Sequence, residues 1–168
     1  MKNILAGIFG GVALTAAAQI AQAAQPGFEG FYIGAKAGYN DSNTSGAVSQ
    51  TVGSGFVAGE AGYGWAVGEN SVLGVDVWAD GHKKSVTGRD YGADLKLGGV
   101  DYDRKVQYYV KLGVAATHPG NRAHYGIGME YKFDRRWGGL LEWTGDTKSK
   151  DAVNYFNNSY VAGVTYHF

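Results

Sequence analysis

Apolar side chains recur at every second position in eight stretches of the chain. We expect strands at about 31–39, 56–67, 72–80, 91–98, 107–116, 124–133, 138–144 and 159–168. A period of two is typical of β-strands, whereas amphipathic helices repeat every 3.6 residues. Beyond the N-terminal segment, no stretch approaches the roughly 18 consecutive apolar residues of a membrane-spanning helix. The pattern therefore predicts a chain that is nearly all β.

The two faces of these predicted strands differ in chemistry. One face has no charged side chain and includes Ile33, Val75, Leu95, Leu112 and Leu141. The other face mixes many glycines with every strand charge: Lys36, Glu60, Asp76, Asp80, Asp94, Lys96, Lys111, Glu130, Lys132 and Glu142. Charges mixed with glycines make a poor solvent face for a two-sheet sandwich, and the apolar positions outnumber what a sandwich core of this length needs. The faces instead fit a barrel in lipid, with the apolar side outward.

Aromatic residues lie toward the two ends of the apolar face, with aliphatic residues between them. One group is Phe31, Trp65, Tyr108, Phe133, Tyr166 and Phe168, and the other is Tyr39, Tyr91, Tyr125, Trp143 and Tyr160. Two aromatic girdles around an aliphatic belt are typical of transmembrane barrels, in which an even strand number brings both termini to the periplasmic side. We predict an all-β, eight-stranded antiparallel up-and-down transmembrane β-barrel. Its outer loops would be 40–55, 81–90, 117–123 and 145–158, and its periplasmic turns 68–71, 99–106 and 134–136.

The N-terminal segment has the pattern of a secretory signal peptide. Lys2 precedes an apolar run from Ile4 to Ala18, which small residues ending in Ala21-Gln22-Ala23 follow. We predict a signal peptide at 1–23 and a barrel domain at 24–168. The chain has no cysteine, which excludes disulfides and thiol chemistry. Its 15 basic and 15 acidic residues leave no excess charge for binding nucleic acid.

Three segments resemble a known family. They are the opening stretch 30–39, the stretch from Gly126 through Trp137 to Trp143, and the closing Tyr166-His167-Phe168. They are similar to the OmpA-like transmembrane domain and to the small single-domain outer-membrane barrels of the opacity, OmpX and Ail type. The resemblance implies an outer-membrane location among lipid and lipopolysaccharide, and insertion by the barrel-assembly machinery. That machinery would recognise the alternating residues of the last strand, which are Tyr160, Ala162, Val164, Tyr166 and Phe168.

The inward charges predict a polar network inside the barrel. An eight-stranded barrel is just wide enough for side chains to fill. The expected members are Lys36, Glu60, Asp76, Asp94, Lys96, Lys111, Glu130, Lys132 and Glu142. Lys111 and Glu130 are a predicted ion pair, because both lie inward near the middle of neighbouring strands. The alternative is that the glycines leave water-filled gaps and the barrel is a narrow, ion-selective channel.

The outer loops carry the other candidate residues. Their cations are Lys83, Lys84, Arg89, Arg122, Lys148 and Lys150. These cations suit a solvated rim, contact with lipopolysaccharide phosphates, or, in an adhesin of the kind that the resemblance implies, an unidentified host or surface ligand.

Enzymatic activity has little support in the sequence. Eight-stranded barrels also include lipid A-modifying enzymes, and His82, His118 and His124 fall at the outer rim, with Ser85 nearby. We find no acid on a strand that is clearly tied to these histidines, so we predict no catalytic site, metal or cofactor. The leading interpretation is a non-enzymatic outer-membrane protein with a structural or surface-interaction role.

Overall fold

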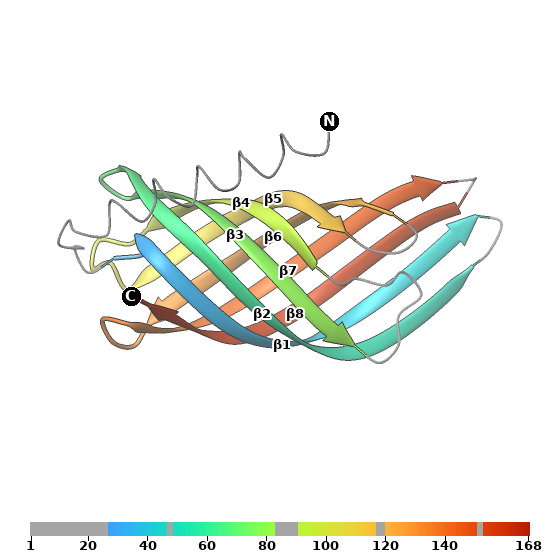
Figure 1. Cartoon of the computed structure of the whole chain (residues 1–168), viewed down its shortest axis with the longest axis horizontal. Helices are drawn as coiled ribbons and strands as arrows, with labels where there is room; N and C mark the ends of the chain where they lie inside the picture. Colours follow the sequence, from blue (N-terminus) through green and yellow to red (C-terminus); the bar gives the residue numbers. More distant parts are fainter. Residues whose placement is uncertain (1–26, 47–48, 83–90, 117–119, 151–152) are drawn as a thin grey trace, which may run out of the picture.

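The chain folds into a closed barrel of eight antiparallel strands (Figure 1). The computed structural model describes residues 27–46, 49–82, 91–116, 120–150 and 153–168. The strands are β1 (Gly30–Gly46), β2 (Gln50–Gly68), β3 (Ser71–His82), β4 (Tyr91–Val100), β5 (Val106–Ala116), β6 (Arg122–Lys132), β7 (Trp137–Lys150) and β8 (Val153–His167). Each strand pairs with the next one along the chain, and β8 pairs with β1. The predicted fold class is confirmed, whereas the predicted signal peptide lies outside the described residues.

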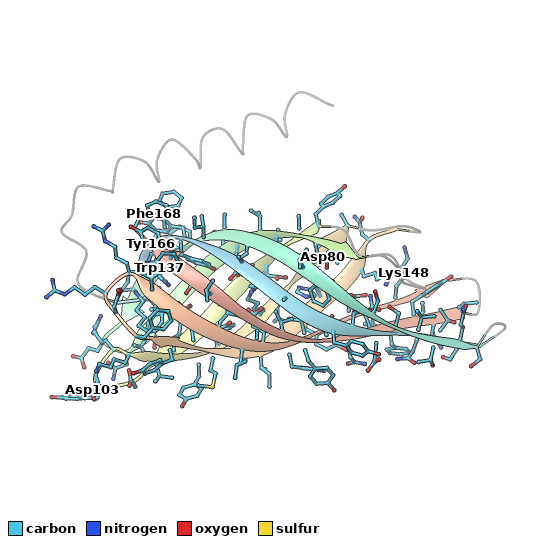
Figure 2. The ribbon with its side chains drawn as sticks, turned by 90° about the horizontal axis from the view of Figure 1, so that it is seen from below. Asp80, Asp103, Trp137, Lys148, Tyr166 and Phe168 are labelled. Carbon is cyan, nitrogen blue, oxygen red and sulfur yellow. The ribbon has the colours of Figure 1, made fainter. Side chains whose placement is uncertain are left out.

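Side-chain burial alternates along every strand, as the sequence predicts. On β4, Leu95 is 58% exposed and Leu97 is 53% exposed, whereas the intervening Lys96 is 5% exposed. Figure 2 shows side chains projecting outward along the whole wall of the barrel. The apolar face is therefore the outer face, and the charges lie inside. No helix among the described residues is long and apolar enough to cross a membrane.

One end of the barrel holds the short connections, the start of β1 and the end of β8 (Figure 1). The connections here are two residues between β2 and β3, residues 101–105 between β4 and β5, and residues 133–136 between β6 and β7. The outer wall at this end is aromatic, as predicted. The ring centroids of Trp137 and Tyr166 are 5.0 Å apart, and those of Tyr166 and Phe168 are 5.1 Å apart (Figure 2). We call this end the short-turn rim.

Four strands are longer than the sequence predicted. Residues 40–55 and 145–158 were expected to be loops, but β1, β2, β7 and β8 continue through most of them, reaching beyond the other four strands (Figure 1). Most residues on both faces of these extensions are polar, and the few apolar ones, such as Val52, Tyr155 and Phe156, do not form the apolar alternation that marks a strand. Backbone pairing between neighbouring strands forms them instead. We call residues 40–46, 50–55, 145–150 and 153–158 the protruding sheet.

Candidate functional site in the barrel interior

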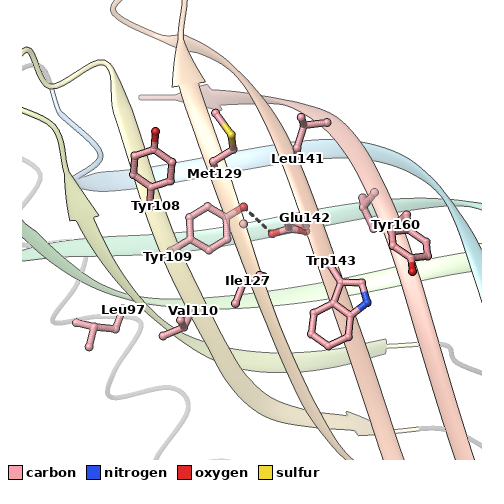
Figure 3. Close-up of a pocket in the computed structure, with 12 residues that line it drawn as sticks. Leu97, Tyr108, Tyr109, Val110, Ile127, Met129, Leu141, Glu142, Trp143 and Tyr160 are labelled. Atoms are coloured by element: carbon pink, nitrogen blue, oxygen red, sulfur yellow. Dashed lines mark hydrogen bonds between the residues drawn. The ribbon is translucent and has the colours of Figure 1, made fainter.

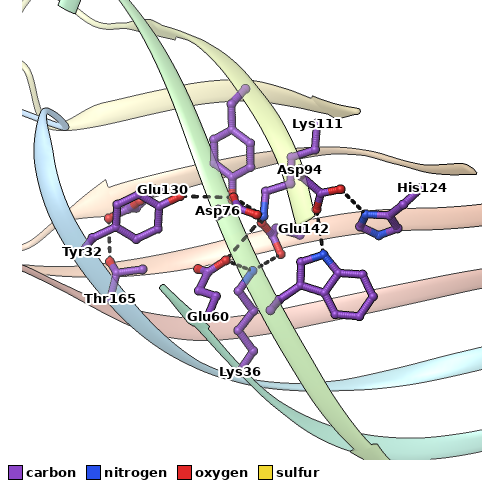
Figure 4. Close-up of polar contacts among 12 residues, drawn as sticks. Tyr32, Lys36, Glu60, Asp76, Asp94, Lys111, His124, Glu130, Glu142 and Thr165 are labelled. Atoms are coloured by element: carbon purple, nitrogen blue, oxygen red, sulfur yellow. Dashed lines mark hydrogen bonds and ion pairs between the residues drawn. The ribbon is translucent and has the colours of Figure 1, made fainter. Parts of the chain in front are cut away.

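Five charged side chains from five different strands meet across the middle of the lumen (Figure 4). The Lys36 ammonium lies 2.5 Å from a carboxylate oxygen of Glu60 and 2.6 Å from one of Glu142. The Lys111 ammonium lies 2.8 Å from Glu142, 3.1 Å from Asp76 and 3.4 Å from Glu60. All five side chains are almost fully buried. We call these five residues the central ion cluster.

Two tyrosines and a third lysine surround this cluster. Tyr32 donates a hydrogen bond of 3.1 Å to Asp76, and Tyr109 donates one of 2.8 Å to Glu142. The Lys96 ammonium lies 4.3 Å from the ring centroid of Tyr32 and 4.7 Å from that of Tyr109. These cation–π contacts stabilise the Lys96 ammonium, which forms no ion pair with any of the described residues. With Lys96 included, three lysines lie near the three carboxylates of the cluster, so their charges are equal in number.

Aromatic rings occupy the space that the inward glycines leave. A Cβ atom added at Gly62 would lie less than 3.0 Å from the ring of Tyr32, and one added at Gly128 would lie less than 3.0 Å from the ring of Tyr109. These inward rings were not predicted, because only charges and glycines marked the inward face. Tyr32 and Tyr109 occupy the same strand phase as the neighbouring charges, so the alternation itself could have identified them.

The predicted Lys111–Glu130 ion pair is wrong. The register sets Lys111 opposite Gly126 and Glu130 opposite Gln107, so the two side chains lie at different heights in the barrel. Glu130 instead accepts a hydrogen bond of 2.5 Å from the Thr165 hydroxyl and lies 2.7 Å from Nε2 of His167. His167 is buried inside the barrel, in the phase opposite to its outward neighbours Tyr166 and Phe168.

A short segment before β1 fills the barrel at the short-turn rim. The Phe28 side chain is 2% exposed and meets the ring of His167 edge-on at 5.9 Å. The Lys132 ammonium lies 4.9 Å from the centroid of Phe28 and donates a hydrogen bond to the Gly27 carbonyl. This closure was not predicted, because Phe28 stands outside any alternating pattern.

A histidine and an aspartate form a buried pair toward the opposite end (Figure 4). Nδ1 of His124 lies 2.6 Å from Asp94, and the Trp78 indole donates a hydrogen bond of 2.9 Å to the same carboxylate. This pair corrects the expectation that no strand-borne acid is tied to the outer histidines. His124 is buried inside the barrel and not at a solvated rim. The described hydrogen bonds of the pair include no serine or threonine hydroxyl.

The predicted surface cation Arg122 is also misplaced. It is the first residue of β6, is 2% exposed and lies 3.0 Å from Asp146. Asn157 donates hydrogen bonds of 3.1 and 3.3 Å to Asp146 and accepts one of 2.6 Å from Ser42. The extension of β7 and β8 turns what the sequence suggested was a loop into a wall, and this wall covers Arg122.

The other loop cations have different outcomes. Lys148 and Lys150 lie on β7 instead of in a loop. The Lys148 side chain is half-buried, and that of Lys150 lies outside the described residues. Lys83, Lys84 and Arg89 also lie outside the described residues, as do His118 and the His82 side chain. Across the described ranges, no three His, Asp or Glu side chains are placed to hold a metal ion.

The residues of the predicted C-terminal assembly signal lie on the outer face of β8 and just after it. Tyr160, Val164 and Phe168 are exposed on this face, as is Ala162, while Tyr166 is half-buried against Trp137. Phe168 follows the strand, and its backbone N–H donates a hydrogen bond of 3.0 Å to the Phe31 carbonyl. The end of the chain thus completes the seam between β8 and β1.

Comparisons with known proteins agree with this architecture. The family model described as outer membrane protein beta-barrel domain matches residues 10–168. The fold is similar to that of Neisserial surface protein A, with a TM-score of 0.56 at 19% identity over 83% of this chain and 98% of that one. It is also similar to a de novo designed transmembrane β-barrel, with a TM-score of 0.50 at 16% identity over 82% of this chain and 94% of that one. No curated protein sequence matches significantly.

Proposed function

Because the chain belongs to the outer-membrane protein β-barrel family, we propose that it is a non-enzymatic outer-membrane protein with a closed interior and a surface-interaction role. Its barrel would be the rigid anchor, and its protruding sheet would make the contacts outside the cell. The observation that carries the proposal is the central ion cluster. It closes the lumen with paired charges, so the chemistry available to a partner lies beyond the barrel.

Three features support a closed interior. The central ion cluster joins strands that are not neighbours, including β1 to β7, β3 to β5 and β2 to β5. The rings of Tyr32 and Tyr109 fill the space beside it. Phe28 and Lys132 fill the lumen at the short-turn rim. An ion crossing the barrel would have to break buried ion pairs. Breaking such a pair is costly, because it leaves a charge without a partner in a packed interior.

Single-channel recording in planar bilayers tests this closure. The unmodified protein should show no steady conductance. Lys111→Met should introduce current, because it removes the cation that joins Asp76, Glu60 and Glu142. Leu112→Met, which faces lipid one residue further on, is the matched control and should stay silent. Steady conductance of the unmodified protein would replace this proposal with the narrow-channel alternative.

A second observation favours contacts through the edge of the protruding sheet. Among the described residues, which exclude 83–90, residues 50–55 of β2 pair only with β1, and pairing with β3 begins at Phe56. These six residues, Gln-Thr-Val-Gly-Ser-Gly, carry no charge and no proline. Proteins usually protect a free edge with lysine, proline or a bulge, because its unpaired amides and carbonyls can bind another strand. The composition of this edge is suited to strand addition by an extended polypeptide.

Adherence of cells that display the protein tests the role of this edge. Thr51→Lys places a charge on the edge and should reduce binding to immobilised matrix proteins. Asn43→Lys is the matched control, because β1 is paired on both sides and has no free edge. Equal adherence of the two variants and the parent would remove the edge from the proposal while leaving the closed barrel untouched.

The proposed orientation sets the protruding sheet outside the cell, and the start of β1 and the end of β8 on the periplasmic side. Short turns on the periplasmic side are typical of such barrels. The cysteine-free sequence allows a direct test with a thiol reagent that does not cross membranes. On intact cells Thr51→Cys should be labelled, whereas Asp103→Cys in the β4–β5 turn should be labelled only after lysis. The reverse pattern would invert the orientation.

A further inference from the structure

The outer wall of the barrel contains an apolar groove of about 700 Å³ over β4 to β8 (Figure 3). Its walls are two rows of outward side chains. Tyr108, Met129 and Leu141 form one row, in which each residue is the cross-strand partner of the next. Val110, Ile127 and Trp143 form the other row in the same way.

The floor of the groove is backbone. Tyr109, Gly128 and Glu142 lie between the two rows, and the side chains of Tyr109 and Glu142 point into the barrel, where they hydrogen-bond to each other (Figure 3). A side chain at Gly128 would likewise point inward, against the Tyr109 ring, so only backbone separates the two rows on the outer wall. The outward side chains of both rows are uncharged, which suits a hydrocarbon chain.

Two turns lie at the short-turn rim, just beyond the Tyr108 row. The backbone carbonyl of Lys105 accepts a 2.7 Å hydrogen bond from the Lys132 amide, which holds the β4–β5 turn against the end of β6. Arg135 lies in the turn that follows β6. Lys105 is three residues from Tyr108 along the chain, and Arg135 is six residues from Leu141. Both cations therefore lie on the short-turn side of the groove, beyond the Tyr108 row.

Two of the three acids of these turns, Asp101 and Asp134, are engaged by backbone amides, whereas Asp103 of the β4–β5 turn is exposed. Asp101 accepts hydrogen bonds of 2.7 and 2.9 Å from the amides of Lys105 and Val106. Asp134 accepts bonds of 2.6 and 3.0 Å from the amides of Arg136 and Trp137. These amide bonds hold the pKa of Asp134 below its ordinary value, so this carboxylate stays charged within its own turn.

The cations of the same turns divide into two groups. Arg104 forms an ion pair of 3.0 Å with Glu29, and Arg136 donates a hydrogen bond of 2.7 Å to the Tyr166 hydroxyl. The side chains of Lys105 and Arg135 have no partner among the described residues. An uncharged groove with two unpaired cations beside it is complementary to an amphiphile in which a hydrocarbon chain ends in an anion.

We infer that this groove binds one anionic phospholipid, with an acyl chain between the two rows and the phosphate at Lys105 and Arg135. The inference goes beyond the proposed function, because it concerns the lipid-facing wall and not the lumen or the protruding sheet. Each cation near an anionic lipid headgroup contributes about 1 kcal/mol, equivalent to about a fivefold change in affinity. The groove supplies the apolar contact, and the two cations supply the preference for negative charge.

Native mass spectrometry of the folded barrel released from vesicles tests the inference. The vesicles contain equal amounts of phosphatidylglycerol and phosphatidylcholine, which have similar acyl chains and differ in net charge. We expect about one retained phosphatidylglycerol per barrel, in excess over phosphatidylcholine. Lys105→Gln with Arg135→Gln should abolish that excess, whereas Lys148→Gln, at the opposite end, should preserve it.

A second pair of variants tests the groove itself. Leu141→Ala should reduce retention of both lipids, because it removes part of one wall. Leu95→Ala is the matched control, since Leu95 is 58% and Leu141 59% exposed but Leu95 lies outside the groove. Equal retention of the two lipids by the unmodified protein would overturn the inference, as would unchanged retention in Leu141→Ala. Neither result would affect the proposed closure or the edge contacts.

Discussion

The central ion cluster and the protruding sheet both fill the inner face of the barrel with polar groups, but they use different chemistry. In the cluster, Lys36 bridges β1 to β7 through Glu142, so the bonds cross the lumen between strands that are not neighbours. In the sheet, Ser42 on β1 bonds to Asn157 on the adjacent β8 at 2.6 Å. In the cluster, ion pairs link strands across the lumen. In the sheet, side-chain amides and hydroxyls link strands that are already paired through their backbones.

The surroundings explain the difference. The cluster lies inside the belt that lipid covers, where an unpaired charge is expensive, so its lysines and carboxylates must match one another closely. The protruding sheet reaches beyond the other strands. Its one described buried ion pair, Arg122–Asp146, lies where it meets β6, and the hydrogen bonds of Ser42, Asn40 and Ser159 join neutral groups. Removal of one partner should therefore cost much more in the cluster than in the sheet.

The largest effect is expected at the centre of the cluster. Lys111→Met leaves carboxylates buried without their cation and should lower the free energy of unfolding in vesicles by about 3–5 kcal/mol. Urea titration with tryptophan fluorescence measures the loss. Adding Glu142→Gln should recover part of it, because the two groups lie 2.8 Å apart. Strictly additive losses would show that the two residues do not interact.

The packing of rings against glycines should give the next largest effect. A Cβ at Gly92 would lie less than 3.0 Å from the Trp78 ring and the Val114 carbonyl oxygen. Gly92→Ala should therefore destabilise the barrel by about 1–3 kcal/mol. A Cβ at Gly99, also on β4, would meet nothing within 4 Å, so Gly99→Ala should change stability by less than about 0.5 kcal/mol. Equal losses in urea titrations would argue against a packed interior.

A smaller effect is expected in the protruding sheet. Ser42→Ala removes a buried hydroxyl that lies 2.6 Å from the acceptor oxygens of both Asn157 and Asn40 and can donate to either one, which should cost about 1 kcal/mol. Amide hydrogen exchange should detect the change as faster exchange in residues 40–46 and 153–158. Thr51→Ala removes an exposed hydrogen bond to Asn43 and is the control. If Ser42→Ala destabilised the protein as much as Lys111→Met, the contrast between the two regions would fail.

The smallest effect should come from the exposed β6–β7 turn. The amides of Arg136 and Trp137 hold the pKa of Asp134 below its ordinary 3.8. A carboxyl with a depressed pKa stabilises the fold above its unfolded-state value, and this contribution disappears as pH falls through the folded-state value. Asp134→Asn should therefore be slightly less stable than the parent at neutral pH and equal to it in strong acid. A difference between them that is independent of pH would contradict this assignment.

The sequence predicted the faces of the strands because each strand has a period of two. Lys96 between Leu95 and Leu97 can occupy only one of two faces, and a shift by one residue would move every charge of β4 into lipid. This constraint determined the fold class and the inward position of all nine predicted network residues. Residues 40–55 escaped prediction because hydrophobicity constrains neither face there, although their backbone pairs as regularly as that of the belt.

Alternation determines which face a side chain occupies, but not its height in the barrel or its partner. Lys111 and Glu130 share a face, yet the register of β5 and β6 separates them and brings Lys111 to Glu142 on β7. Closure of the barrel likewise brings Phe28 to His167, which are far apart in the sequence. The sequence by itself therefore determined what lies inside the barrel and what faces lipid. Only the tertiary structure decided which inward charges meet, because pairing depends on strand register and on contacts across the lumen.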